Sequence, residues 1–228
     1  MIFKQFFDKD SSTYTYLVGS ELNKDALIID SVLDNTKEYI NFIRINNLNL
    51  LHVLDTHIHA DHISGMSMLS EHFACEMLMG RETSAEGLTR KLDHNEEFNL
   101  GDLTVRTLFT PGHTSDSYCF LISDRLFTGD TLLIGETGRT DFQNGNSDSA
   151  YNSLFEILLK LPDDTIVYPG HDYNGRSSST IGEEKKTNPR LQVKSQREYV
   201  DMMSNLKLSY PKKMDVSITR NLKLGKNK

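Results

Sequence analysis

Cysteine, long apolar runs and blocks of like charge are all scarce in this chain of 228 residues. The two cysteines, Cys75 and Cys119, lie far apart in apolar surroundings, which predicts buried free thiols rather than a disulfide or a redox pair. No apolar stretch approaches the length that crosses a bilayer, so we expect no membrane protein. The net charge of −7 contains no long block of one sign, which argues against a nucleic-acid surface and an anionic membrane partner.

The first ten residues contain neither the apolar core of a signal peptide nor the arginine-rich, acid-poor composition of a transit peptide. We therefore expect a cytoplasmic protein. The length and the hydrophobic fraction of 37% suit a substantial core, and no linker clearly divides the chain. We expect a single domain over residues 1–228, with a C-terminal helical and tail region from about residue 182.

One short segment, residues 56–65, concentrates metal-binding side chains. It reads T-H-I-H-A-D-H-I-S-G and places His57, His59, Asp61 and His62 within six positions. Residues two apart on a helix point away from each other, so the segment is expected to be an extended loop. The apolar run just before it predicts a buried strand on which such a loop is mounted. The alternative interpretation is a polar loop whose histidines face water.

Three further candidate ligands each follow an apolar strand and a glycine: His113 in T-P-G-H-T-S, Asp130 in F-T-G-D-T and His171 in Y-P-G-H-D-Y. A glycine before the ligand lets the backbone turn sharply, so the repeated design predicts that these side chains converge on a metal. The remaining histidines lack this context, and we expect them at the edge of the core or on the surface: His52, His72 and His94.

Hydrophobic spacing predicts the order of the secondary structure. Strands are expected over residues 14–18, 26–29, 50–54, 77–79, 103–109, 117–122, 125–128 and 165–168. Helices are expected after three candidate caps, Thr36, Ser64 and Asp148, and over residues 196–206, followed by a lysine-rich tail that is expected to fray. Strands followed by helices, repeated once, predict two related halves that pack sheet against sheet with the helices outside.

Together, the H-x-H-x-D-H motif at residues 57–62 and the later His113, Asp130 and His171 resemble the metallo-β-lactamase superfamily over nearly the whole chain. The resemblance implies an α/β fold, an αββα sandwich with the metal at one edge of its two sheets. This fold carries thioester and lactone hydrolysis, phosphodiester cleavage and oxygen chemistry, so the superfamily alone does not specify the reaction.

A more specific segment is G-R-T-D-F-Q at residues 138–143, which resembles the persulfide dioxygenases, also called sulfur dioxygenases. The stretches Y-P-G-H-D-Y at 168–173 and N-P-R-L at 188–191 agree with that family. This resemblance implies one Fe(II) per chain, held by His57, His113 and Asp130 with coordination positions left open. It implies oxidation of the sulfane sulfur of glutathione persulfide by O2, giving sulfite and glutathione.

The same resemblance implies supporting roles for further residues. A second layer around the metal would orient ligands and water: His59, Asp61, His62, His171 and Asp172. Thr114 and Tyr173 would offer hydroxyl groups to oxygen or substrate. Arg190, with Arg139 behind it, would grip the glutathione carboxylates, although a surface role for Arg190 and a purely structural ion pair between Arg139 and Asp141 are alternatives. A homodimer is expected from the family only.

The main alternative is a hydroxyacylglutathione hydrolase of the glyoxalase II type with two metals. His57, His59 and His113 would hold one metal, Asp61, His62 and His171 the other, and Asp130 would bridge them. The G-R-T-D-F-Q segment argues against it. A non-enzymatic sensor or scaffold is disfavoured because no ligand has been lost. One departure from some persulfide dioxygenases is Leu224, which occupies the cysteine position of their N-x-x-C-G element, so no thiol there is expected to be essential.

Overall fold

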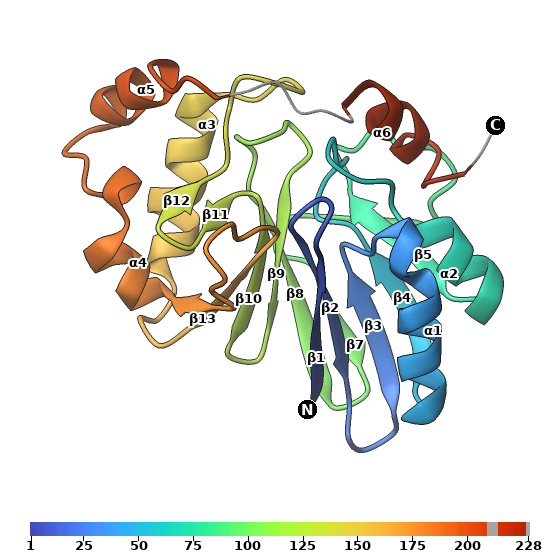
Figure 1. The fold of residues 1–228 in the computed structure, drawn as a ribbon. Coiled ribbons are helices and arrows are strands. Elements are labelled where there is room, and N and C mark those ends of the chain that lie inside the picture. The colour runs from blue at the N-terminus through green and yellow to red at the C-terminus, as the bar shows by residue number, and fades with distance from the viewer. Residues whose placement is uncertain (209–213, 227–228) are drawn as a thin grey trace.

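Strands and helices alternate along the chain in the computed structural model, which describes residues 1–208 and 214–226 (Figure 1). The first half contains β1 (Ile2–Asp8), β2 (Thr13–Gly19), β3 (Asp25–Ile29), the 3-10 turn η1 (Leu33–Asn35), α1 (Thr36–Ile45), β4 (Asn49–Leu54), α2 (Met66–Phe73), β5 (Glu76–Gly80) and β6 (Arg90–Leu92). The strands of the second half are β7 (Glu97–Leu100), β8 (Leu103–Phe109), β9 (Tyr118–Ile122), β10 (Arg125–Gly129), β11 (Leu132–Leu133), β12 (Glu136–Thr137), β13 (Ile166–Pro169) and β14 (Ser179–Thr180).

The helices of the second half start with α3 (Ser147–Asn152), which continues as a π-helical stretch (Ser153–Ile157) and a 3-10 turn (Leu158–Lys160). They end with α4 (Ile181–Thr187), the 3-10 turn η4 (Pro189–Leu191), α5 (Gln196–Ser204) and α6 (Met214–Asn221). Among the described residues, no helix is long and apolar enough to cross a membrane.

Two six-stranded sheets pack face to face. The first has the order β1-β2-β3-β4-β5-β6 and the second has the order β14-β13-β10-β9-β8-β7. Helices α1, α2 and α6 lie outside the first sheet, and α3, α4 and α5 lie outside the second (Figure 1). The expected α/β architecture, an αββα sandwich, is confirmed.

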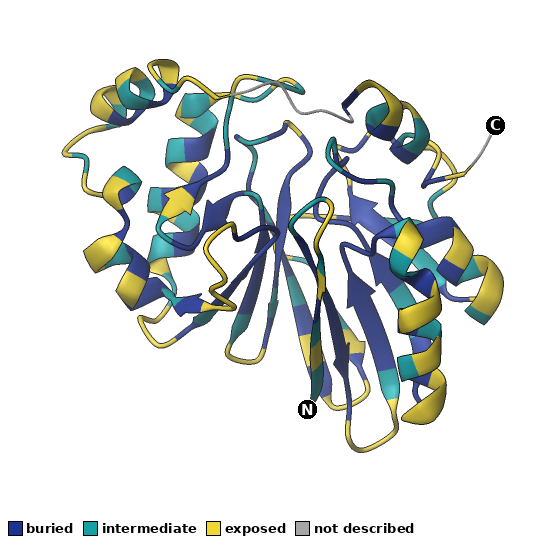
Figure 2. Cartoon of the chain, viewed as in Figure 1, coloured by how far each residue is buried: buried dark blue, intermediate teal, exposed yellow. Residues whose placement is uncertain are grey.

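Three apolar layers hold the sandwich together, and the alternation of side chains along each strand creates them. In β2, Tyr16 and Val18 belong to the cluster between the sheets, whereas Leu17 faces outward to the cluster under α1 and α2. A third cluster, including Leu126, Leu154 and Tyr199, seals the second sheet against its helices. Figure 2 shows the sheets largely buried and the outer helix surfaces exposed.

The local expectations were mostly correct, with some corrections. Every expected strand is present within about two residues at either end. The edge strand β1 was missed because it alternates only weakly, and the short strands β6, β7, β11, β12 and β14 were missed because two to four residues show no clear period. Neither Thr36 nor Asp148 caps its helix: the Thr36 hydroxyl donates to Leu33 O, and the Asn146 side chain accepts the Ser149 amide instead. The Ser64 hydroxyl does accept an amide of the α2 helix, from Met66.

The prediction of a frayed tail is wrong for residues 214–226. They form α6 and a following turn in which Leu224 is buried against the first sheet's outer cluster. Lysines recur along the tail, and the apolar positions between them are too few to show the spacing of a helix. The remaining tail positions, 209–213 and 227–228, lie outside the described residues.

Candidate metal centre

The candidate ligands all follow the carboxyl ends of strands at one edge of the sandwich. His57 follows β4, His113 follows β8, Asp130 follows β10 and His171 follows β13. Strands β10 and β13 are parallel, and β8 runs in the same direction because both β8 and β10 are antiparallel to β9. The edge of the sheet therefore brings three ligands together, and the loop after β4 adds the fourth from the other sheet.

Glycines make this convergence possible, as the sequence predicts. Gly129, just before Asp130, has a φ of +48°, and a Cβ atom there would meet the Thr56 hydroxyl at 2.4 Å. A Cβ atom on Gly170, just before His171, would lie 2.5 Å from Asp130 Oδ1. Any larger residue at these positions would displace a ligand or the strand end that carries it.

Three groups of ligand atoms form in this region. His57, His113 and Asp130 offer ligand atoms that all lie within 4.8 Å of one another, and so do His59, Asp61 and His62. The third group, formed by Asp30, Asp55 and His59, shares His59 with the second. His171 connects the first two groups, because its Nε2 lies 3.4 Å from Asp130 Oδ2 and 3.6 Å from Asp61 Oδ2. The first group is the set that the sequence predicts for a single iron.

Hydrogen bonds to the protein set which nitrogen of each imidazole faces the centre. His113 donates from Nδ1 to Arg139 O at 2.8 Å, and His171 donates from Nδ1 to Ser12 O at 3.0 Å. The Thr56 hydroxyl donates its proton to Asp30, so it accepts one from His57 Nδ1 at 3.0 Å. With Nδ1 as the donor, the neutral ring of each histidine carries its lone pair on Nε2, which is the form that binds metals.

Several buried polar atoms at the centre have no partner within the described protein: His59 Nδ1, His62 Nε2 and Asp130 Oδ1. Buried polar atoms are normally paired, and unpaired ones need an explanation. Imidazole nitrogens and carboxylate oxygens are donors that suit Fe(II) or Zn(II). The residues present therefore fit a bound metal ion.

The electrostatics of His57 and Asp61 also suit a cation. Burial, reinforced by His59 and His113, holds the pKa of His57 well below its usual value, so the ring stays neutral and able to ligate. Burial alone would raise the pKa of Asp61, but His62 and His171 outweigh it and lower that pKa well below the ordinary value. Burial likewise opposes the charge on His59, yet Asp30 raises its pKa to about 10. His59 is thus held by Asp30 Oδ1, 3.0 Å from its Nε2.

A cavity of about 540 Å³ opens over the centre. Its lining includes the following residues predicted from the sequence: His57, Asp61, His113, Asp130, Arg139, His171, Tyr173 and Arg190. The volume falls within the range of small-molecule sites. The cavity therefore combines a metal-binding floor with a wall that offers two guanidinium groups.

Both guanidinium groups are held in place by carboxylates. Arg139 pairs with Asp141 through two hydrogen bonds of 2.6 and 2.8 Å, and its guanidinium lies over the Phe142 ring. Arg190 pairs with Glu136 at 3.1 Å and also donates to Thr137 O. The Arg190 side chain is only 14% exposed, which places it in the cavity wall rather than on an open surface.

Tyr173 also lies at the cavity, with its ring stacked parallel to the His171 ring at 6.0 Å. The structure does not bring Thr114 there, since its buried hydroxyl donates to Asp116 at 2.7 Å and contacts Ser117. Asp172 faces away as well, because its carboxylate accepts two backbone amides and the Arg176 side chain.

Sequence reasoning missed residues from other parts of the chain that support the centre. Thr13, Asp30 and Asn221 bond residues of the metal loop, Asp116 accepts the Ile58 amide, and Glu136 pairs with Arg190. Asp30 alone had a local signal, since it ends the apolar strand β3 as Asp130 follows β10. The histidines expected elsewhere do lie outside the centre. His52 pairs with Glu76, His72 lies beside Arg44, and His94 accepts the Phe109 amide.

Comparisons with known proteins agree with this geometry. Residues 8–171 match the model of the metallo-β-lactamase superfamily. The mitochondrial persulfide dioxygenase ETHE1 of Mus musculus is 36% identical to this chain over 228 residues. The match covers 99% of this chain and 89% of the relative. The crystal structure of ETHE1 from Myxococcus xanthus superposes with a TM-score of 0.97 at 45% identity, covering 99% of this chain and all of that one.

A relative with a different activity in its name matches less of the chain. The hydroxyacylglutathione hydrolase of Dictyostelium discoideum is 38% identical over 177 residues, which is 72% of this chain and 63% of the relative. The similarity to the persulfide dioxygenases thus extends over the part of the chain that this match leaves out.

Proposed function

The chain belongs to the metallo-β-lactamase superfamily and, within it, to the persulfide dioxygenase family, and on this premise we propose that it is an iron-dependent dioxygenase of glutathione persulfide. The reaction consumes one glutathione persulfide, one O2 and one water, and yields glutathione, sulfite and two protons. The proposal includes one Fe(II) per chain, a cytoplasmic location and a possible homodimer.

The observation that carries the proposal is the group formed by His57, His113 and Asp130, set in the floor of the cavity. Two imidazoles and one carboxylate form the facial arrangement used by non-haem iron oxygenases. Bound there, Fe(II) would supply the electron transfer that makes O2 reactive toward the persulfide sulfur. Fe(II) also favours these ligands in their deprotonated forms, which the low pKa of His57 provides.

The residues of the chain supply orientation and charge. Arg139 fixes the His113 ring through its backbone carbonyl, and its side chain and Arg190 offer positive charge to the carboxylates of the glutathione moiety. His59, Asp61, His62 and His171 hold the ligands and ordered water around them. Tyr173, whose ring is parallel to that of His171, lines the cavity and would offer its hydroxyl group to oxygen or substrate.

A hydroxyacylglutathione hydrolase remains the second candidate. The group formed by His59, Asp61 and His62 favours it, because these residues and His171 would complete a second metal site. The Dictyostelium relative supports it over a smaller part of the chain. In that enzyme a hydroxide between two metals would attack a thioester carbonyl.

One experiment separates the two candidates. Anaerobically iron-loaded protein is given glutathione persulfide while O2 uptake and sulfite are measured, and S-lactoylglutathione hydrolysis is measured in parallel. We expect O2 uptake and sulfite in equal amounts with about one iron per chain. Absent O2 uptake, with rapid thioester hydrolysis and two zinc ions per chain, would refute the dioxygenase.

Metal content of Asp61→Ala is the second test. With one iron held by His57, His113 and Asp130, this variant should keep nearly stoichiometric iron, although its activity falls. Loss of half of the bound metal would instead support the two-metal site.

A further inference from the structure

The loop over residues 55–65 carries four metal-binding side chains but has no helix or strand to satisfy its backbone. Buried backbone groups must find partners, and here distant backbone groups and distant side chains provide them. Asp30 accepts the Thr56 amide, Asp116 accepts the Ile58 amide, and Gln143 donates to Ile58 O. These contacts hold the first half of the loop, around His57.

In the second half, Leu33 donates its amide to Ile63 O and Ser31 O accepts the Gly65 amide. The turn between His59 and Ser64 is held by one side chain, Asn221 at the end of α6. Its Nδ2 donates to His59 O at 2.9 Å and to His62 O at 2.8 Å. Its Oδ1 accepts the Ser64 amide at 2.9 Å. The Asn221 side chain is buried, and one carboxamide thus satisfies three backbone groups across the turn that carries Asp61 and His62.

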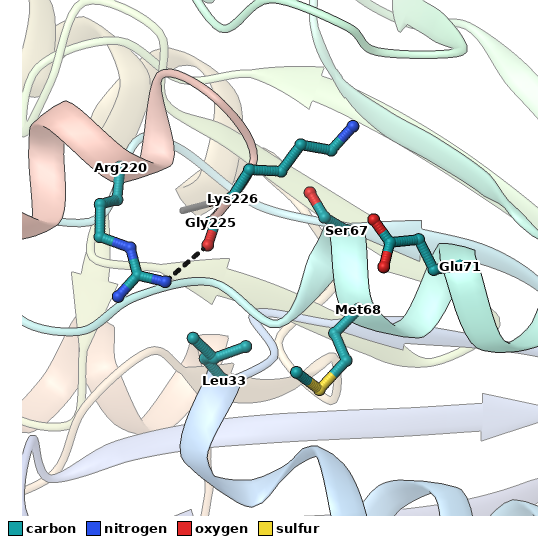
Figure 3. Close-up of a pocket in the computed structure, with 7 residues that line it drawn as sticks. All are labelled: Leu33, Ser67, Met68, Glu71, Arg220, Gly225 and Lys226. Carbon is teal, nitrogen blue, oxygen red and sulfur yellow. Dashed lines mark hydrogen bonds between the residues drawn. The ribbon is translucent and has the colours of Figure 1, made fainter. Parts of the chain in front are cut away.

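The segment after Asn221 is fastened to the same region. Leu224 O accepts both the amide and the hydroxyl of Ser67, in the first turn of α2. Gly225 has a φ of +80°, and a Cβ atom there would meet Ser64 O at 2.0 Å. The Arg220 side chain donates to Gly225 O and closes the turn beside a cavity of about 270 Å³ (Figure 3).

We infer that Asn221 is a positioning residue of the metal centre, which sets how tightly and in what geometry the metal is held. It bonds carbonyl groups 159 and 162 residues away in the chain, on both sides of Asp61. Without its two donors, these carbonyls would lie buried and unpaired, and the turn would move to reach water. His57 lies two residues before the first of them, so the movement reaches a ligand of the first group.

This inference rests on the proposed metal site, and metal binding tests it independently of turnover. The test variant is Asn221→Asp, which keeps the shape and the acceptor for the Ser64 amide but replaces the two donors by an oxygen. The matched control is Asn188→Asp. Asn188 is also buried and donates to Glu136 O and to Glu184 while accepting the Arg190 amide, so it supports the cavity wall and bonds no candidate metal ligand or metal-loop carbonyl.

The measurements are Fe(II) affinity by anaerobic competition with a chelator, the Co(II) absorption spectrum, and thermal unfolding. We expect Asn221→Asp to bind Fe(II) about 10 to 100-fold more weakly, as is typical of residues that support ligands, and to change the Co(II) spectrum. Asn188→Asp should unfold at a lower temperature but keep the wild-type affinity and spectrum. Equal losses of affinity in both variants would mean that Asn221 acts only through global stability, which overturns the inference.

Asn221→Ser is the second variant, in case the aspartate prevents folding. Its hydroxyl can donate to only one of the two carbonyls, so an intermediate loss of affinity is expected. Wild-type affinity and spectrum in either folded Asn221 variant would overturn the inference. Failure of the wild-type protein to bind Fe(II) or Co(II) would instead refute the proposed metal site.

Discussion

The Thr13 hydroxyl donates a hydrogen bond of 2.9 Å to Asp61 Oδ2, joining the hairpin between β1 and β2 to the metal loop 48 residues later. The same hairpin supplies the carbonyl of Ser12 that orients His171. Asp10 and Ser11, at its tip, line the cavity. The N-terminal hairpin is therefore part of the centre, and the Asp61 carboxylate depends on it for orientation.

Thr13→Val tests this contact, because valine keeps the shape and removes the donor. The Asp61 carboxylate loses a hydrogen bond that holds it beside His62 and His171, so kcat/KM for glutathione persulfide should fall about 10-fold. Steady-state O2 uptake measures the effect. Thr104→Val, at an exposed position of β8, is the control and should retain wild-type activity. An unchanged kcat/KM in Thr13→Val would show that the contact has no functional role.

Gly170→Ala should impair metal binding without a change in any ligand. The added Cβ atom would lie 2.5 Å from Asp130 Oδ1, so either the carboxylate or the end of β13 must move. We expect Fe(II) affinity to fall at least about 10-fold, measured by metal analysis after dialysis against a chelator. In Gly19→Ala the nearest atom would lie 3.4 Å away, an ordinary contact, and iron should be retained. Full iron content in Gly170→Ala would contradict the close packing of Asp130.

Arg190→Lys should raise KM with little change in kcat. Lysine keeps the charge but lacks the planar pair of donors that binds a carboxylate, so ground-state binding weakens. We expect KM for glutathione persulfide to rise about 10-fold. Glu136→Gln is the informative companion, since it removes the carboxylate that competes for Arg190 and should leave KM equal or lower. If KM rises only in Glu136→Gln, the pair is structural and Arg190 does not bind substrate.

The buried Tyr39 should make the free energy of unfolding depend on pH in the alkaline range. Burial raises the pKa of Tyr39 to about 12 from its ordinary value of 10.0, because the ionised form would be poorly solvated. Since the folded-state pKa exceeds the unfolded one, this stabilisation is complete below pH 10 and is lost as the pH rises toward 12. The loss approaches about 1.4 kcal/mol per pH unit.

The measurement compares the free energy of unfolding of the wild type and of Tyr39→Phe from pH 8 to pH 11. The variant lacks the hydroxyl that bonds Thr15 and accepts the Val32 amide, so at pH 8 it should be less stable by about 1 kcal/mol. Above pH 10 the two curves should converge, because only the wild type loses this contribution. Parallel curves would contradict the pKa shift.

Short-range patterns were sufficient to predict the longer strands, apart from β1, and the loops that carry the candidate ligands. The apolar run before His57 and the glycines before His113, Asp130 and His171 each describe a strand followed by a sharp turn, and the structure confirms those strands and turns. These features can be recognised in a single sequence because the period of a strand, the conformation of glycine and the chemistry of a ligand are local properties.

Helix caps and the tail were predicted less well, because they depend on contacts that are not local. Asn146 rather than Asp148 caps α3: its side chain accepts the Ser149 amide, because the extended backbone at Asn146 places that side chain beside the first turn. The tail contains α6 because Leu224 finds a buried position against the first sheet, and composition alone does not reveal that contact.

The amino-acid sequence was enough to predict a cluster of imidazoles and carboxylates on loops that end apolar strands, in an αββα framework. The way in which that cluster is held follows from the three-dimensional packing alone. Thr13 reaches Asp61 across 48 residues, and Asn221 reaches His59 across 162. Contacts at such separations depend on the packing of whole sheets and helices, so no periodicity or motif near either residue predicts them.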